Sequence, residues 1–276
     1  MNQRACFVAF ILCTASFASF ARAPVGSDDF TPPPDNWGPG PPAVLNYGQL
    51  TEANQRLEYT TQGNNHSQTD FAQWSWNSYT DTPASWTFQI DINLPDLNLD
   101  PAQYVLFGLK LNDQRDPEHV FSFGYNSFAG ASFAVAHEFT AVTPNGTFSR
   151  QCSATTPCAG LTEIGELTAL RLRFDATSNT LFTDFDANGP NGGYTWVNLS
   201  STPNFIPDTI FVFGQSSNRS VTSADNVYGA NVSTTTVVVP EPSTYAMLGL
   251  GIGLVGWLAR GSRKLVPSRS GVLIMR

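Results

Sequence analysis

The chain is poor in cysteine and in basic residues, and it lacks a long apolar run. It has four cysteines, and its 14 lysine or arginine residues stand against 22 aspartate or glutamate residues. Between residues 24 and 239 there are seven basic and 21 acidic side chains, a net charge of −14. This charge excludes nucleic acid as a partner, because phosphate binding requires clustered lysine and arginine. No apolar run reaches the roughly 20 residues that a membrane-spanning helix needs.

The N-terminal residues have the pattern of an export signal. An early positive charge precedes an apolar run over residues 5–20, and the run ends in Ala-Arg-Ala. Small residues in this arrangement are typical of signal-peptidase cleavage sites. We therefore expect a signal peptide over residues 1–23, cleaved after Ala21 or after Ala23. Pro24 directly follows the second position and is unfavourable there. Cleavage after Ala21 is therefore equally compatible with the sequence.

The C-terminal region combines a short motif, an apolar segment and a positive cluster. The tripeptide Pro240-Glu241-Pro242 precedes a glycine-rich apolar stretch over residues 245–259. The basic cluster that follows consists of Arg260, Arg263 and Lys264. Together, residues 240–264 resemble the PEP-CTERM sorting signal of exported bacterial proteins. The apolar stretch is short for a spanning helix. It therefore favours a temporary attachment to the membrane over a tilted permanent anchor.

This resemblance implies a destination and a first partner. In that family an exosortase-type transpeptidase acts on the tripeptide while the C-terminal helix holds the substrate transiently in the inner membrane. The basic cluster would stay cytoplasmic by the positive-inside rule. Gly261 and Ser262 interrupt the usual arginine run, and residues 265–276 form a C-terminal extension beyond it. The chain is thus expected in the cell envelope or outside the cell, and processing of its tail stays open.

The exported body has the pattern of β-strands. Over residues 85–94, five apolar side chains alternate with five polar ones, the period of a half-buried strand. Outside the termini no long window shows helical periodicity. This pattern of strands without helices predicts an all-β protein built as a two-sheet antiparallel sandwich or a barrel. Nine further strands are expected at residues 56–62, 71–79, 104–111, 120–125, 132–142, 167–175, 180–187, 194–199 and 209–214.

Three stretches of the body resemble a known family. LTEANQRLEYTTQ, SWTFQIDINLP and LRLRFDATSNTLFTDFDANG are similar to the concanavalin A-like jelly roll of bacterial lectin and glucanase domains. The resemblance implies a β-sandwich over residues 44–233. A Pro/Gly-rich extended segment over residues 24–43 precedes it, with Phe30 and Trp37 available to dock, and a linker over residues 234–239 follows. Because this fold hosts many activities, it implies a function only weakly.

Two cysteines lie in the body. Cys152 and Cys158 are separated by five residues, and in an oxidising compartment they are expected to form a loop-closing disulfide or to stay a free pair. A structural zinc site is not expected there, because it needs four ligands and no second cysteine or histidine pair is near.

One loop resembles the metal-binding segment of legume lectins. The sequence DPEHVFSFGYNSF has the expected Asp-Pro, His and Asn-Ser order, but the preceding strand carries Gly108 and Lys110 where the lectins have carboxylates. A charged lysine cannot bind a hard cation. Asp113, Asp116 and His119 are therefore expected to form a polar loop.

The segment DFDANG is a second candidate for a cation site. Asp184, Asp186 and Asn188 match the start of a calcium-binding loop, although Thr195 stands where a bidentate glutamate is required. Aspartate and asparagine next to glycine also form ordinary turns. Calcium is thus the one cofactor that the sequence suggests, and a plain turn is the alternative.

Motifs for catalysis are absent from the sequence. A jelly-roll glucanase is expected to show an E-x-D-x-E pattern on one strand face, and a serine hydrolase a G-x-S-x-G turn. Neither occurs here. We therefore expect a non-catalytic carbohydrate-binding or structural sandwich, with a polysaccharide-active glycoside hydrolase or lyase as the alternative.

Three tryptophans are candidates for stacking on the sugar rings of an extracellular polysaccharide. Trp74 and Trp76 share one strand face, and Trp196 follows a glycine-rich turn. Aromatic faces suit sugar rings, but they also fill the space between two sheets. Each tryptophan is therefore expected either at a binding surface or in the core.

Overall fold

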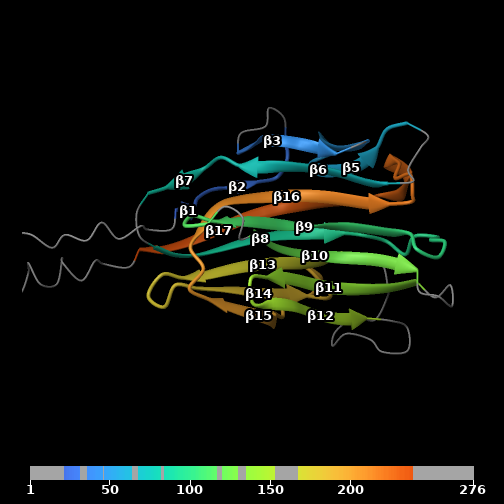
Figure 1. The fold of residues 1–276 in the computed structure, drawn as a ribbon. Coiled ribbons are helices and arrows are strands. Elements are labelled where there is room, and N and C mark those ends of the chain that lie inside the picture. The colour runs from blue at the N-terminus through green and yellow to red at the C-terminus, as the bar shows by residue number, and fades with distance from the viewer. Residues whose placement is uncertain are drawn as a thin grey trace, which may run out of the picture. The chain divides into compact units, whose positions relative to one another are not determined.

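Two antiparallel sheets account for nearly all of the described protein. The computed structural model describes residues 22–31, 36–45, 47–63, 68–81, 84–116, 120–129, 135–152 and 167–238. Within them it contains 17 strands and one 3-10 turn, Ser223–Asp225 (Figure 1). The same ranges contain no helix that is long and apolar enough to span a bilayer. The predicted all-β antiparallel sandwich is confirmed.

The first sheet has seven strands in the order β12-β11-β10-β9-β16-β6-β3. The half of the sheet that ends at β12 is a run of hairpins, because β9 to β12 follow one another in sequence and pair as neighbours. The strands are β3 Trp37–Leu45, β6 Thr69–Trp76, β9 Tyr104–Asp113, β10 Val120–Ala129, β11 Val135–Thr143, β12 Gly146–Cys152 and β16 Pro207–Ser217.

The second sheet has eight strands. Seven follow the order β15-β14-β13-β8-β17-β5-β4, and β2 pairs with β17 beside this path. The strands are β2 Ser27–Asp28, β4 Gly48–Ala53, β5 Arg56–Thr61, β8 Ala84–Asn93, β13 Thr168–Asp175, β14 Thr180–Asp186, β15 Val197–Pro203 and β17 Tyr228–Val238. The short strands β1 Ala23–Pro24 and β7 Tyr79–Thr80 form a separate pair.

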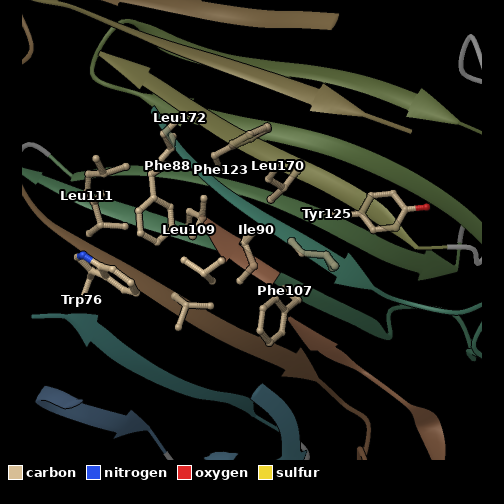
Figure 2. Packing of buried hydrophobic residues seen from close by; sticks show 14 of the residues in the cluster. Trp76, Phe88, Ile90, Phe107, Leu109, Leu111, Phe123, Tyr125, Leu170 and Leu172 are labelled. Carbon is tan, nitrogen blue, oxygen red and sulfur yellow. The ribbon is translucent and has the colours of Figure 1, made fainter. Parts of the chain in front are cut away.

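Aromatic side chains from both sheets fill the space between them. Figure 2 shows residues of β6, β9 and β10 meeting residues of β8 and β13 in this layer. Trp76 of the first sheet packs edge-on against Phe88 of the second, with ring centroids 5.3 Å apart. Phe139 and Phe185 stack across the sheets at 4.2 Å. The strand period of two thus directs one face of each sheet into a shared core and the other face outward.

The N-terminal segment belongs to the sandwich. Phe30 and Trp37 are buried in the core, and the Trp37 ring lies 4.9 Å from that of Trp76. The boundary expected between residues 43 and 44 therefore falls inside β3. Proline limits β3 to the sheet edge, because proline cannot donate a ladder hydrogen bond.

The linker expected over residues 234–239 differs from the structure. β17 continues to Val238 and stays paired with β8, from Thr234 opposite Phe88 to Val238 opposite Ala84. The sequence TTTVV here is rich in β-branched side chains, which favour strands. A polar, threonine-rich run at the end of a domain was mistaken for a linker because it lacks clear alternation.

The start of the described chain is held by specific contacts. Ala23 is buried and pairs with Thr80 of β7. The Arg22 guanidinium lies 4.5 Å from the centre of the Tyr79 ring and 3.4 Å from the Asp81 carboxylate. Both residues therefore contribute to the packing of the body.

We predict that signal peptidase cleaves after Ala21, so that the exported protein begins at Arg22. A cut after Ala23 would remove half of β1 and place a charged amino terminus on Pro24, which is buried. Burying an unpaired charge costs several kcal/mol. Intact-mass measurement of the exported protein checks this, and an N-terminus at Pro24 would contradict it.

Candidate functional site

An open polar hollow lies on the outer face of the eight-stranded sheet. Its volume is about 600 Å³. Gln89 of β8 and Asn231 and Ser233 of β17 line it from the sheet, and Tyr194 lines it from the loop between β14 and β15. We call it the Tyr194 hollow. Its remaining lining comes from the N-terminal segment and from β17, with Ser27, Asp28, Asp29, Thr31, Asn36 and Val232.

Local strand geometry places the polar groups of this hollow. On β8, Phe88, Ile90 and Ile92 point into the core, so Gln89 and Asp91 point outward. β17 has a bulge between Ala230 and Ser233. Within the bulge Asn231 has φ 52°, a left-handed conformation that asparagine tolerates well.

A buried carboxylate on this outer face is the centre of a hydrogen-bond network. Asp91 is 0% exposed although it lies on the polar side of its strand. The Tyr194 hydroxyl donates to both of its carboxylate oxygens, at 3.0 and 3.2 Å, and the Asn231 amide donates at 2.9 Å. These donors tie the β14–β15 loop and the β17 bulge to β8. Because Tyr194 belongs to this loop, the strand expected over residues 194–199 starts only at Val197.

The titration of Asp91 and Tyr194 reflects this enclosure. Burial raises the pKa of the Asp91 carboxyl, although Asn231 and Tyr194 both donate to it, and the charge of nearby Asp186 adds to the rise. Burial and the adjacent Asp91 charge raise the pKa of the Tyr194 hydroxyl well above its ordinary value. Tyr194 thus keeps its proton and acts as a donor.

Aromatic and cationic side chains stack beside the hollow. The rings of Tyr194 and Trp196 are stacked at 5.1 Å with an interplanar angle of 13°. The Arg171 guanidinium lies 4.3 Å from the centre of the Trp196 ring. Tyr194 is 39% exposed, so part of its ring surface is open to solvent along the hollow.

Of the two alternatives for Asp184, Asp186 and Asn188, calcium loop or plain turn, the observed contacts are those of a turn. Arg171 and Arg173 bind Asp184 at 2.8 and 3.2 Å. Asp186 accepts the backbone N–H groups of Asn188 and Thr195, which is the geometry of a turn. In the described ranges no group of three acidic, histidine or cysteine side chains could hold a metal ion.

The ion pairs also set the charge of Asp184. Burial alone would raise the pKa of its carboxyl, but hydrogen bonds from Arg173, Asn198 and Arg171 hold that pKa below the ordinary value. The carboxylate therefore stays ionised and bound to the two arginines. Its role is to fix Arg171 beneath Trp196.

The three candidate tryptophans have different environments. Trp76 is 1% exposed, and its indole N–H donates to the Ser78 carbonyl, so of the two expected positions it takes the one in the core. Trp74 is partly buried and packs against the core. Trp196 lies beside the Tyr194 hollow, in contact with Tyr194. The period of two showed which tryptophans share a face but did not show which face is inside.

Comparison with known proteins gives one assignment for the end of the chain. Residues 238–264 match the PEP-CTERM protein-sorting motif. This signal directs export to the cell envelope, as its resemblance implied. Among curated proteins, none matches the chain in sequence.

The body is similar in structure to legume-lectin-like sandwiches. Lectin I-B4 from Griffonia simplicifolia, in a metal-free form, is 12% identical over 71% of this chain and 93% of the lectin, with a TM-score of 0.42. Winged bean acidic lectin, solved with methyl-α-D-galactose, is 11% identical over 76% and 95%, with a TM-score of 0.45. The legume lectin-like domain from Entamoeba histolytica is 11% identical over 74% and 90%, with a TM-score of 0.40.

Several predicted sites lie outside the described residues. They include the PEP-CTERM tripeptide Pro240, Glu241 and Pro242 and the basic cluster Arg260, Arg263 and Lys264. The expected disulfide cannot be placed either, because Cys158 lies outside the described ranges.

The polar loop that follows β9 is described in part. Asp113 binds Arg115 at 3.0 Å, so its carboxylate has a cationic partner. Lys110 is half-buried on the outer face of the first sheet, and burial lowers its pKa. His119 lies outside the described residues.

Sequence reasoning missed the centre of the hollow. Asp91 and Gln89 were read only as the polar side of a strand, and Tyr194 was placed inside a strand. A signal was present, because aspartate is rare in the middle of strands and usually has a specific partner there. That partner is Tyr194, 103 positions away in the sequence.

We predict that Asp91 makes stability depend on pH. The folded protein holds the Asp91 proton more tightly than the unfolded chain does, so this group favours folding in acid. That contribution is lost as the pH rises from the ordinary value of 3.8 through the raised folded-state pKa. The unfolding free energy of wild type relative to Asp91→Asn should therefore fall across this range, measured by denaturant titration between about pH 3 and pH 7.

Asp96→Asn is the matched control, because Asp96 is exposed just beyond the same strand. It should follow the wild-type pH profile. A difference between wild type and Asp91→Asn that stays constant with pH would contradict the proposed state of Asp91.

Proposed function

We propose that the exported body is a non-catalytic, carbohydrate-binding β-sandwich and that it binds extracellular polysaccharide at the Tyr194 hollow. The observation that carries this proposal is the partly exposed, rigidly held Tyr194 ring at the side of an open hollow lined by polar side chains. The PEP-CTERM motif supports delivery of such a protein to the envelope.

The chemistry of the hollow suits sugar rings. An aromatic face supports the apolar C–H side of a pyranose, while amides and carboxylates exchange hydrogen bonds with its hydroxyl groups. Gln89, Asn231 and Ser233 supply such groups from the sheet, and Asp29 and Asn36 supply them from the N-terminal segment. The Asp91 hydrogen bonds hold the Tyr194 ring in place, which reduces the entropy lost on binding.

The carboxylates around the hollow do not favour hydrolysis. A glycosidase needs one carboxyl that keeps a proton and another that flanks the same bond. Asp91 has a raised pKa but is enclosed beneath Tyr194 and Asn231. Asp29 lines the hollow, but hydrogen bonds from the side chain and backbone of Thr31 lower its pKa and keep it ionised. These arrangements favour binding over the alternative of a jelly-roll glycoside hydrolase or lyase.

The tail completes the proposal. An exosortase-type transpeptidase would act on the Pro240-Glu241-Pro242 tripeptide after the signal peptide has started export. Until then the C-terminal helix would hold the protein transiently in the inner membrane, with residues 265–276 as a cytoplasmic extension. A purely structural role in the envelope is the competing function, and ligand binding separates the two.

Replacing the exposed ring should weaken sugar binding. We expect Tyr194→Ala to raise the Kd for a bound polysaccharide about tenfold, because a ring contact worth about 1 kcal/mol and its fixed geometry are both lost. The measurement is calorimetry on the purified exported protein against soluble β-glucans, mannan and chitin oligosaccharides.

Phe148→Ala is the matched control, since Phe148 of β12 is an exposed ring (38%) on the other sheet. It should leave the Kd unchanged. Absence of binding to the whole panel by the wild-type protein would favour the structural role, and equal affinities of wild type and Tyr194→Ala would move the site elsewhere.

Replacing Pro240-Glu241-Pro242 by three alanines should leave the protein unprocessed and in the membrane fraction of its native host, because the transpeptidase would no longer recognise it. Mass spectrometry of each fraction checks this. Ser270→Ala, in the C-terminal extension, is the control and should be processed normally. Identical masses and distribution for the triple variant and wild type would refute a role of the tripeptide in processing.

A further inference from the structure

A second hollow lies near the same strands as the first. Its volume is about 560 Å³, and we call it the Tyr228 hollow. Tyr228 is the first residue of β17, and the Arg56 guanidinium lies 4.3 Å from the centre of its ring. Its polar lining includes Asn93, Asp96 and Asn226. This hollow therefore also combines a held tyrosine ring with hydrogen-bonding groups.

The two hollows follow one pair of strands. β8 and β17 are hydrogen-bonded neighbours, with Ser233 opposite Gln89 and Tyr228 opposite Asn93. Gln89 lines the Tyr194 hollow and Asn93 lines the Tyr228 hollow. Because positions 89 and 93 differ by an even number, both side chains point to the outer face of the sheet. Four residues of strand separate them by about 13 Å.

The outer-face position between the hollows lies beneath Tyr194 and Asn231. On β8 the intervening position is Asp91, which is fully buried by its hydrogen bonds to Tyr194 and Asn231. Opposite it on β17 is Ala230, whose side chain is a methyl group. A ligand that runs from one hollow to the other therefore crosses the Tyr194 ring, which is 39% exposed, and the exposed Asn231.

We propose that the two hollows are the ends of one binding track along β8 and β17, and that the ligand is an internal stretch of a polysaccharide chain. This inference rests on the proposed function. A single sugar ring is shorter than the separation of the hollows, so it contacts only one tyrosine. A chain that reaches both gains the second contact without a second loss of translational freedom.

The track predicts a dependence on chain length. Oligosaccharides of two to eight units from β-1,3-glucan, β-1,4-glucan and β-1,4-mannan are the probes, measured by calorimetry with the exported protein. The Kd should fall at least tenfold between the disaccharide and the hexasaccharide of the bound series and then level off. Tyr228→Ala should weaken hexasaccharide binding while leaving the disaccharide at the Tyr194 hollow unaffected.

Two further variants test whether misfolding explains the effect of Tyr228→Ala. Tyr228→Phe keeps the ring and should weaken hexasaccharide binding less than Tyr228→Ala does. Asp96→Ala changes an exposed residue of the Tyr228 hollow and should weaken only the longer oligosaccharides.

The outcomes separate the two proposals. Disaccharide and hexasaccharide affinities within twofold of each other, or hexasaccharide binding that neither Tyr228→Ala nor Asp96→Ala changes, would overturn the track but leave binding at the Tyr194 hollow intact. Failure of every probe to bind wild type would overturn the proposed function itself, and the track with it.

Discussion

Aromatic packing between two sheets is the constraint on which the rest of this structure depends. Trp76 of one sheet and Phe88 of the other meet edge to face, and Trp37 from the N-terminal segment packs against both. Filling this layer takes one side of every central strand, and the strand period then fixes which residues remain outside. The outer faces of the described strands therefore carry most of their polar side chains, and loops are anchored there by polar contacts.

The Tyr194 hollow shows how such anchoring produces a site. A buried carboxylate on an outer face is costly unless donors surround it. Asp91 meets this need with a tyrosine from one loop and an asparagine from a strand bulge, and the same contacts hold the tyrosine ring rigid. Asp184 of β14 acts similarly, because it binds Arg171 and so holds that side chain beside Trp196. In both cases the acidic residue serves as a support for an aromatic ring.

The sequence was sufficient for the fold class and for the sorting motif but not for the site. Alternation over residues 85–94 is regular and predicted β8 well. β17 was missed although it is a central strand, because its threonine-rich run does not alternate between apolar and polar residues. The sequence could not show that Trp76 is buried and that Trp196 lies at the surface hollow, since burial depends on which face of a strand meets the other sheet. The contact between Tyr194 and Asp91 could not be predicted, because it arises only when strands distant in sequence have paired.

The pairing of β2 with β17 brings the two ends of the body together. Ser27 lies opposite Ser233, and the Thr234 hydroxyl donates to the Gly26 carbonyl at 2.7 Å across 208 positions of sequence. Part of the Tyr194 hollow is thus lined by residues near the start of the described chain and part by its last strand. Contacts of such long range form late in folding. A chain still in transit therefore has no complete hollow, and a ligand that binds there stabilises only the finished protein.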